Sequence, residues 1–219
     1  MDIRRQKGFT LLEITVVVAV IALLSTIFLA NYRGGDKQYA LLRASHKLAQ
    51  DIRAIEEMAL SSRKTPTEIF GGTFPKGGYG IYITNDPLGD YQCSTASLSN
   101  GGYCIFLFAD CDGGRDYDKS SDGTNVSCSD AGEDPFGTDP SKSVVEFVKE
   151  FTLESGVKII EIWPIGSELT ITFLPPDPIV VINNDPNISL AYVKIGYEGQ
   201  ESWKKININH LGQIEITSY

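Results

Sequence analysis

The strongest pattern along the chain is an apolar segment close to its start. No residue between positions 14 and 32 is charged. A helix rises ~1.5 Å per residue, so this run reaches roughly 28 Å, the thickness of one bilayer core. Three cations precede the run, at Arg4, Arg5 and Lys7. Because positive charges stay on the cytoplasmic side, the pattern predicts a membrane-spanning helix with a cytoplasmic N-terminus and an exported remainder.

After this segment, apolar residues recur every three or four positions, which is the period of an amphipathic helix. The stripe consists of Leu41, Ala44, Leu48, Ile52, Ile55 and Ala59. Gly34 and Gly35 each destabilise a helix by ~1 kcal/mol, so we expect a kink or a short break at residues 31–36. We expect the helix to end at Thr65 and Pro66, because proline restricts the residue before it.

The second half of the chain alternates apolar and polar residues, which indicates β-strands. Strands are expected at residues 78–83, 103–110, 157–162, 168–173, 178–183, 189–197, 203–209 and 212–217. Residues 209–212 predict a hairpin turn, and a helical turn is expected only at residues 143–149. The elements together predict an α+β fold, in which a long N-terminal helix packs its stripe on an antiparallel β-sheet or sandwich.

Residues 110–139 form a long acidic insertion. Its carboxylates include Asp110, Asp112, Asp116, Asp118 and Asp122. Asp110, Asp112, Asp116 and Asp118 lie at alternate positions of residues 110–118, with Gly114 at the middle one. Calcium loops collect their oxygen ligands at such alternate positions. The insertion departs from the EF-hand pattern, because Arg115 takes the place of the glycine and Ser121 that of the final glutamate. A calcium site and a solvated acidic loop are both compatible with this sequence.

Composition narrows the function. The chain has 219 residues and a net charge of −9, and an acidic exported domain disfavours nucleic-acid binding. Its four cysteines are Cys93, Cys104, Cys111 and Cys128. In an oxidising compartment they permit two disulfides, and we favour the local pairs Cys93–Cys104 and Cys111–Cys128 over free thiols.

No catalytic constellation is evident. His46 is expected on the helix surface and His210 in a turn, and neither has a recognisable serine and carboxylate partner. Trp163 and Trp203 are expected in the core or on a sheet face.

The segment Gly8-Phe9-Thr10-Leu11-Leu12-Glu13 resembles the processing site of type IV prepilins and type II secretion pseudopilins. The resemblance implies that a prepilin peptidase cuts between Gly8 and Phe9 and methylates the new amine of Phe9. It also implies that Glu13 pairs with the N-terminal amine of a neighbouring subunit. The alternatives are a Glu13 hydrated at headgroup depth and an ordinary signal peptide, for which small cleavage-site residues are poorly placed.

Later segments resemble H-type pseudopilins and FimT-like minor pilins, with a helix packed on a β domain. The segments concerned are residues 44–55, 78–83, 103–110 and 169–176. Some FimT-like relatives bind DNA through arginines near the C-terminus. The matching tail here, residues 212–219, has no arginine, so direct nucleic-acid binding is not expected.

The resemblance implies a leader peptide at residues 1–8, a membrane-spanning and filament-core helix at 9–32, an amphipathic half at 33–64 and an exported β domain at 65–219. The implied function is a non-enzymatic subunit of a type IV pilus or type II secretion filament. Its expected partners are other pilins, the peptidase and, before assembly, membrane lipid. The alternatives are a filament-tip subunit that binds a surface or cargo through the acidic loop, and an exported enzyme on a pilin-like anchor.

Overall fold

The structure is a computed structural model that describes residues 9–64, 74–85, 101–110, 113–115, 117, 147–176, 179–199 and 201–218, apart from the side chains of residues 30–34 and 147. The chain divides into two compact units, residues 1–39 and 40–219. One helix, α1 (Leu11–Leu60), begins in the first unit and ends in the second.

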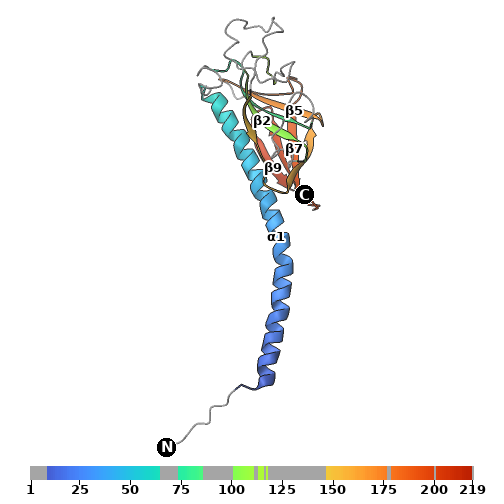
Figure 1. The fold of residues 1–219 in the computed structure, drawn as a ribbon. Coiled ribbons are helices and arrows are strands. Elements are labelled where there is room, and N and C mark those ends of the chain that lie inside the picture. Colours follow the sequence, from blue (N-terminus) through green and yellow to red (C-terminus); the bar gives the residue numbers. More distant parts are fainter. Residues whose placement is uncertain are drawn as a thin grey trace, which may run out of the picture. The chain divides into compact units, whose positions relative to one another are not determined.

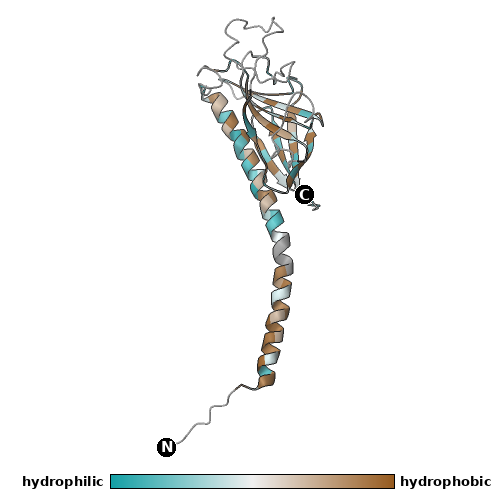
Figure 2. Ribbon diagram, in the orientation of Figure 1, coloured by the Kyte–Doolittle hydropathy of each residue, from teal (hydrophilic) through white to brown (hydrophobic). Residues whose placement is uncertain are grey.

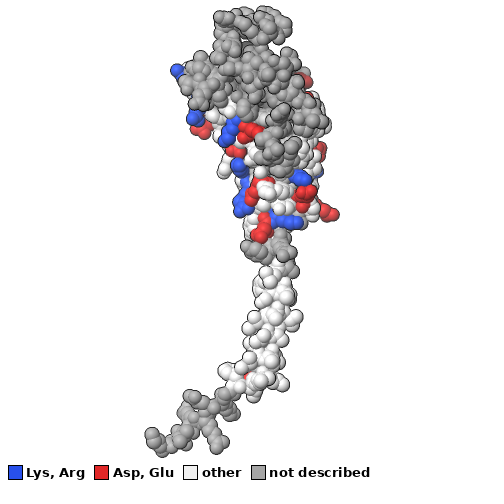
Figure 3. All heavy atoms as spheres, in the orientation of Figure 1, with Lys and Arg blue, Asp and Glu red and all other residues white. Residues whose placement is uncertain are grey.

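The first unit contains the apolar part of α1, and none of its described side chains is buried. Every described side chain from residue 9 to residue 29 is exposed. Leu11–Leu29 has a mean hydropathy of 2.6 and is long and apolar enough to cross a membrane. Figure 2 shows this part of α1 as largely hydrophobic, and Figure 3 shows it nearly free of charged side chains. Length and composition therefore agree with the predicted membrane span.

The expected break at residues 31–36 is wrong. The helical assignment of α1 is uninterrupted through Gly34 and Gly35. Glycine weakens a helix by ~1 kcal/mol but still donates and accepts the helical hydrogen bonds, so two glycines do not interrupt the ladder. The kink, which was the other expectation, stays a prediction.

The helix ends at Leu60, earlier than the expected stop at Thr65 and Pro66. Ser62 has a φ of 47°, in the left-handed region, and its N–H donates to the carbonyl of Ala59 at 3.0 Å. The N–H of Arg63 donates to the carbonyl of Met58, also at 3.0 Å. These two bonds form a Schellman motif, which satisfies carbonyls left free at a helix C-terminus. The sequence signal for this stop was weak because serine occupies the position where glycine is usual.

The strands form two antiparallel sheets (Figure 1). The five-stranded sheet has the order β3-β2-β1-β5-β6 and the four-stranded sheet the order β4-β7-β8-β9. The bounds are β1 (Gly78–Thr84), β2 (Cys104–Asp110), β3 (Phe147–Phe151), β4 (Val157–Trp163), β5 (Glu168–Leu174), β6 (Ile179–Ile182), β7 (Leu190–Tyr197), β8 (Trp203–Asn209) and β9 (Ile214–Ser218). The α+β prediction is confirmed.

Each strand expected from alternation is present, with small shifts at the ends. The helical turn expected at residues 143–149 is wrong where the structure describes it, because residues 147–149 belong to strand β3. In β3, Phe151 pairs with Ile105 and Lys149 with Leu107. This pairing joins residues far apart in sequence, so the local pattern of a short strand did not reveal it.

One hydrophobic core joins α1 to both sheets. The predicted helix stripe is buried throughout, and Ile52 and Ile55 have no exposed surface. The five-stranded sheet contributes Ile81, Ile105 and Ile171, among others. The four-stranded sheet contributes residues of β4, β7 and β8 that alternate along each strand, except across an irregularity between Ile159 and Glu161: Val157, Ile159, Ile162, Ala191, Val193, Ile195, Ile206 and Ile208. The apolar stripe therefore provides the surface on which the sheets pack.

We predict that Ile52→Ala lowers the free energy of unfolding by about 2–5 kcal/mol, because it leaves a cavity in this core. Urea unfolding followed by tryptophan fluorescence measures the change. Ile165→Ala removes the same atoms from a side chain that is 50% exposed, and its effect should stay below about 1 kcal/mol. Equal losses in the two variants would contradict the assigned helix packing.

Candidate functional site

The residues predicted for processing and assembly lie at the start of α1. Gly8 lies outside the described residues, whereas Phe9 is described and 80% exposed. The hydroxyl Oγ1 of Thr10 accepts a hydrogen bond from the N–H of Glu13 at 3.3 Å. Threonine followed three residues later by glutamate is the sequence of a capping box, and an acid also suits the positive end of the helix dipole. Glu13 thus has a local role at the helix start.

Glu13 is also the only charged residue of Leu11–Leu29. The two threonine hydroxyls of this segment bond back to helix carbonyls, Thr15 to Leu11 and Leu12 at 3.0 and 2.8 Å, and Thr26 to Leu23 at 2.7 Å. They are therefore satisfied inside the helix, as an apolar surrounding requires. Glu13 forms no ion pair with any residue that the structure describes. Its charge is the one formal charge of the segment and has no oppositely charged partner among the described residues.

The acidic insertion starts at a buried carboxylate. Asp110 ends β2 with no exposed surface. Its Oδ1 accepts a hydrogen bond from the N–H of Gly113 at 2.7 Å, and its Oδ2 accepts one from the N–H of Arg115 at 2.8 Å. Gly77 lies against the same carboxylate so closely that a Cβ would sit 1.7 Å from Oδ2, and its N–H donates to the Asp110 carbonyl at 3.0 Å. Asp110 therefore anchors the start of the insertion.

The next residues of the insertion lie on the face of the five-stranded sheet that is turned away from α1. The ring of Tyr117 stacks on Tyr82 with centroids 4.8 Å apart and lies 5.4 Å from the ring of Phe108. The hydroxyl of Thr172 donates to the carbonyl of Arg115 at 2.9 Å. These contacts bury the second face of β1 and β2, which explains why every residue of both strands is buried.

The structure tests only part of the predicted calcium set. Asp112, Asp116, Asp118 and Asp122 lie outside the described residues. Within the described part of the chain, no cluster of three histidine, cysteine or acidic side chains could hold a metal ion. Asp110 is already a hydrogen-bond acceptor for two backbone donors, a role that the sequence pattern did not reveal. Calcium stays a prediction.

Cys104 is disulfide-bonded, so the free-thiol alternative is wrong for this cysteine. The other three, Cys93, Cys111 and Cys128, lie outside the described residues. The favoured pairing stays a prediction.

The outer face of the four-stranded sheet is aromatic and charged. Trp163, which is 50% exposed, stacks on Tyr192 at 6.3 Å between ring centroids. The Tyr192 hydroxyl donates to Oε1 of Glu161 at 2.7 Å, and this hydrogen bond raises the pKa of the tyrosine. Lys194 lies over the ring of Trp203 at 4.3 Å. The expected sheet-face position of the two tryptophans is confirmed, and these contacts occupy the face with its own side chains.

The histidines lie as predicted. His46 is exposed on α1, and His210 is exposed in the turn between β8 and β9. The His210 N–H donates to the carbonyl of Ser189 at 3.0 Å, and Nδ1 lies 3.4 Å from the same oxygen. In the Asn209 turn, the side-chain Oδ1 accepts from the N–H groups of Leu211 and Gln213. These contacts stabilise a hairpin turn, which the sequence predicted.

Comparison with known proteins identifies a methylation motif in the N-terminal segment. The model described as "Prokaryotic N-terminal methylation motif" matches residues 3–29, which include Gly8, Phe9 and Glu13. The chain is also similar to "Type II secretion system core protein G" of Klebsiella pneumoniae, with 29% identity over 104 residues, covering 41% of this chain and 74% of that protein. No solved structure matches the chain.

We predict that Asp110→Ala lowers the free energy of unfolding by about 3 kcal/mol, because the N–H groups of Gly113 and Arg115 lose a buried, charged acceptor. Hydrogen exchange at Gly113 and Arg115 should accelerate at the same time. Asp185 accepts an exposed hydrogen bond from the N–H of Asn187 at 2.8 Å, so Asp185→Ala is the matched control and should change stability by less than about 1 kcal/mol. Unchanged exchange at both amides would refute the anchor.

Proposed function

We propose that the chain is a minor filament subunit of a type IV pilus or a type II secretion machine, because the methylation motif and the similarity to a type II secretion core protein support a pilin-like family member. The observation that carries this proposal is an apolar helix with a methylation motif and one acid near its start, Glu13, which forms no ion pair with the described residues. The role is structural and the mechanism is assembly. No enzymatic activity is part of the proposal.

Processing comes first in this proposal. A prepilin peptidase cuts between Gly8 and Phe9 and methylates the amine of Phe9. The match of the methylation motif to residues 3–29 supports this step. The cut removes Arg4, Arg5 and Lys7, the cations that hold the N-terminus on the cytoplasmic side. The mature chain then begins directly with its apolar segment.

The precursor waits in the cytoplasmic membrane as a single-pass protein with its β domain exported. The length and hydropathy of Leu11–Leu29 support a membrane span. During assembly this helix leaves the lipid and packs against the same helices of other subunits. One apolar surface thus serves in succession as a lipid contact and as a filament core. The exposure of all its described side chains in the single chain fits both uses.

Glu13 sets the axial register of the filament. A carboxylate placed in an apolar surrounding is destabilising by several kcal/mol unless a positive group pairs with it. The N-terminal amine of Phe9 on a neighbouring subunit supplies that group. Because both charges are unfavourable alone, the pair favours one axial offset between neighbours.

A further part of the proposal concerns which filament the subunit belongs to, a pilus or a secretion filament. The similarity to a protein named as a type II secretion core protein supports a secretion filament, and the shared leader fits a pilus equally. Within the family, the helix packed on two sheets supports an H-type pseudopilin or a FimT-like minor pilin.

A second role, binding at the filament tip, rests on the acidic insertion. Near its start, Asp110 accepts hydrogen bonds from Gly113 and Arg115, and Tyr117 stacks on Tyr82 of the five-stranded sheet. If the insertion binds calcium, Asp112, Asp116, Asp118 and Asp122 are the proposed ligands, since Asp110 already accepts two backbone hydrogen bonds.

We predict that Gly8→Arg abolishes processing, because the resemblance places glycine directly before the cut. Intact mass after co-expression with a prepilin peptidase measures the result, and the variant should keep residues 1–8. Gln6→Arg adds the same charge two residues earlier and should be processed normally. A processed Gly8→Arg chain would refute the proposed site.

We predict that Glu13→Ala inserts into the membrane normally but enters filaments about tenfold less, or worse. The amine of the neighbouring subunit then lacks its charged partner. A loss of only ~1.4 kcal/mol in the free energy of association lowers the association constant tenfold. Glu57→Ala removes an exposed acid from the same helix and serves as the control. Subunit content of sheared filaments is the measurement, and wild-type incorporation of Glu13→Ala would exclude the register role.

A further inference from the structure

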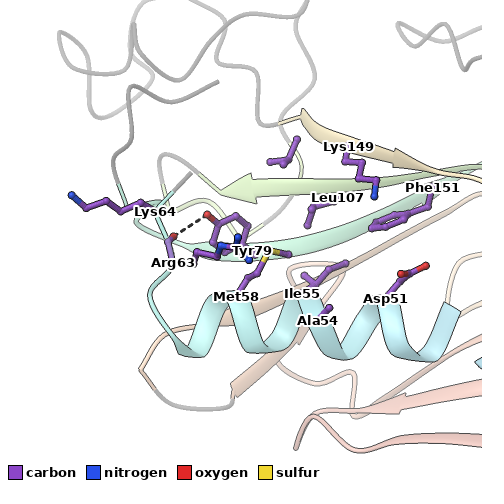
Figure 4. Close-up of a pocket in the computed structure, with 11 residues that line it drawn as sticks. Asp51, Ala54, Ile55, Met58, Arg63, Lys64, Tyr79, Leu107, Lys149 and Phe151 are labelled. Atoms are coloured by element: carbon purple, nitrogen blue, oxygen red, sulfur yellow. Dashed lines mark hydrogen bonds between the residues drawn. The ribbon is translucent and has the colours of Figure 1, made fainter. Parts of the chain in front are cut away.

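A cavity of about 520 Å³ lies inside the second unit, between the end of α1 and the five-stranded sheet. Figure 4 shows its walls: Ile55 and Met58 project from α1, Tyr79 from β1, and Phe151 from β3. The volume falls in the range of sites that bury small ligands. None of the sequence motifs or the processing site accounts for it.

The walls of this cavity are apolar and the charges lie at its ends. Its polar side chains, among the lining residues that the structure describes, are Asp51, Arg63, Lys64, Lys149 and the Tyr79 hydroxyl. The hydroxyl already donates to the Arg63 carbonyl at 2.9 Å. A peptide backbone placed there would bring N–H and C=O groups that need partners. An acyl chain brings none, so the apolar walls favour a hydrocarbon.

The two ends of the cavity differ in charge. At one end lies Asp51; burial raises the pKa of this carboxyl, and the charges of Lys47 and Lys149 oppose that rise. At the other end lies Arg63, close enough to Tyr79 for its charge to act on the phenol, where burial raises the pKa and Arg63 opposes the rise. Arg63 and Lys64 form no ion pair with the described residues. The Arg63 end, where no described lining residue is acidic, therefore carries the larger positive charge.

The position of Arg63 is fixed by the fold. Its N–H closes the Schellman motif at the end of α1, and its carbonyl accepts from Tyr79. A guanidinium offers a planar pair of N–H donors that matches a carboxylate. An anionic head group therefore has a cationic partner, attached to a fixed backbone, beside the apolar walls.

We propose that this cavity binds a fatty acid, with the carboxylate on Arg63 and the acyl chain between α1 and β3. The chain runs over Met58, whose flexible thioether adapts to an irregular ligand, and past Phe151 toward the Asp51 end. Binding at this site is a property of the exported domain and does not depend on the filament role.

The test uses the full chain in an uncharged detergent and a dodecanoate probe that carries a diazirine. After illumination, mass spectrometry of peptides locates the label. We expect labelled peptides from residues 54–58 and 147–151 that an excess of plain dodecanoate protects. Label confined to residues 11–29 would mean partition onto the apolar helix and would overturn the proposal.

Variants test the head group and the channel separately. Arg63→Gln should weaken labelling of the cavity about tenfold, as expected for lost charge-assisted hydrogen bonds. Lys204→Gln removes the same charge from β8, away from the cavity, and should leave labelling unchanged. Ala54→Trp starts from an exposed helix position and should fill the cavity and abolish labelling. Circular dichroism checks that each variant is folded.

Two further results would contradict the assignment. Equal labelling by the methyl ester of the probe would exclude recognition of the carboxylate. Protection by the tripeptide Glu-Leu-Phe but not by dodecanoate would assign the cavity to an acidic apolar peptide instead.

Discussion

The fold depends on burying one face of α1 within the second unit. The stripe that includes Leu41, Leu48 and Ile55 packs against both sheets, and one continuous core results. The helix therefore has two chemically different parts. Residues 40–60 have a surface to cover and a partner within the chain, whereas Leu11–Leu29 is apolar and has none among the described residues. The apolar surface of Leu11–Leu29 therefore has to be covered by lipid or by other subunits. This requirement connects the structure to membrane insertion and to assembly.

The sequence predicted the parts of this account that depend on local periodicity. The spacing of Leu41, Leu48 and Ile55 identified the buried stripe, and alternation identified every strand except β3. The misses have non-local or atypical causes. Strand β3 is defined by its pairing with β2, and the end of α1 by a left-handed Ser62 where glycine is usual. The hydrophobic pattern was therefore sufficient to predict the fold class, but it was not sufficient to predict the residue at which α1 ends.

The residues of the candidate site also divide into those that the sequence revealed and those that it did not. Glu13 was detectable because a charge stands out in an apolar run. The anchoring role of Asp110 was not, because it depends on a close approach of Gly77 and on backbone donors from Gly113 and Arg115. The alternating acids in the sequence suggested a metal site, but the first of them, Asp110, is buried and accepts hydrogen bonds from the backbone. The cavity at Arg63 had no sequence signal, since its walls come from one helix and three strands that meet only in the folded domain.

The most direct test of the account is a zero-length link between neighbouring subunits. Filaments assembled from a mixture of isotopically light and heavy chains would be treated with an apolar carbodiimide, which joins a carboxylate to an adjacent amine. The account predicts an amide between Glu13 of one subunit and the N-terminal amine of Phe9 of another, found in peptides that combine light and heavy chains. A link formed only within single chains, or no link at Glu13, would contradict the pairing on which the assembly mechanism rests.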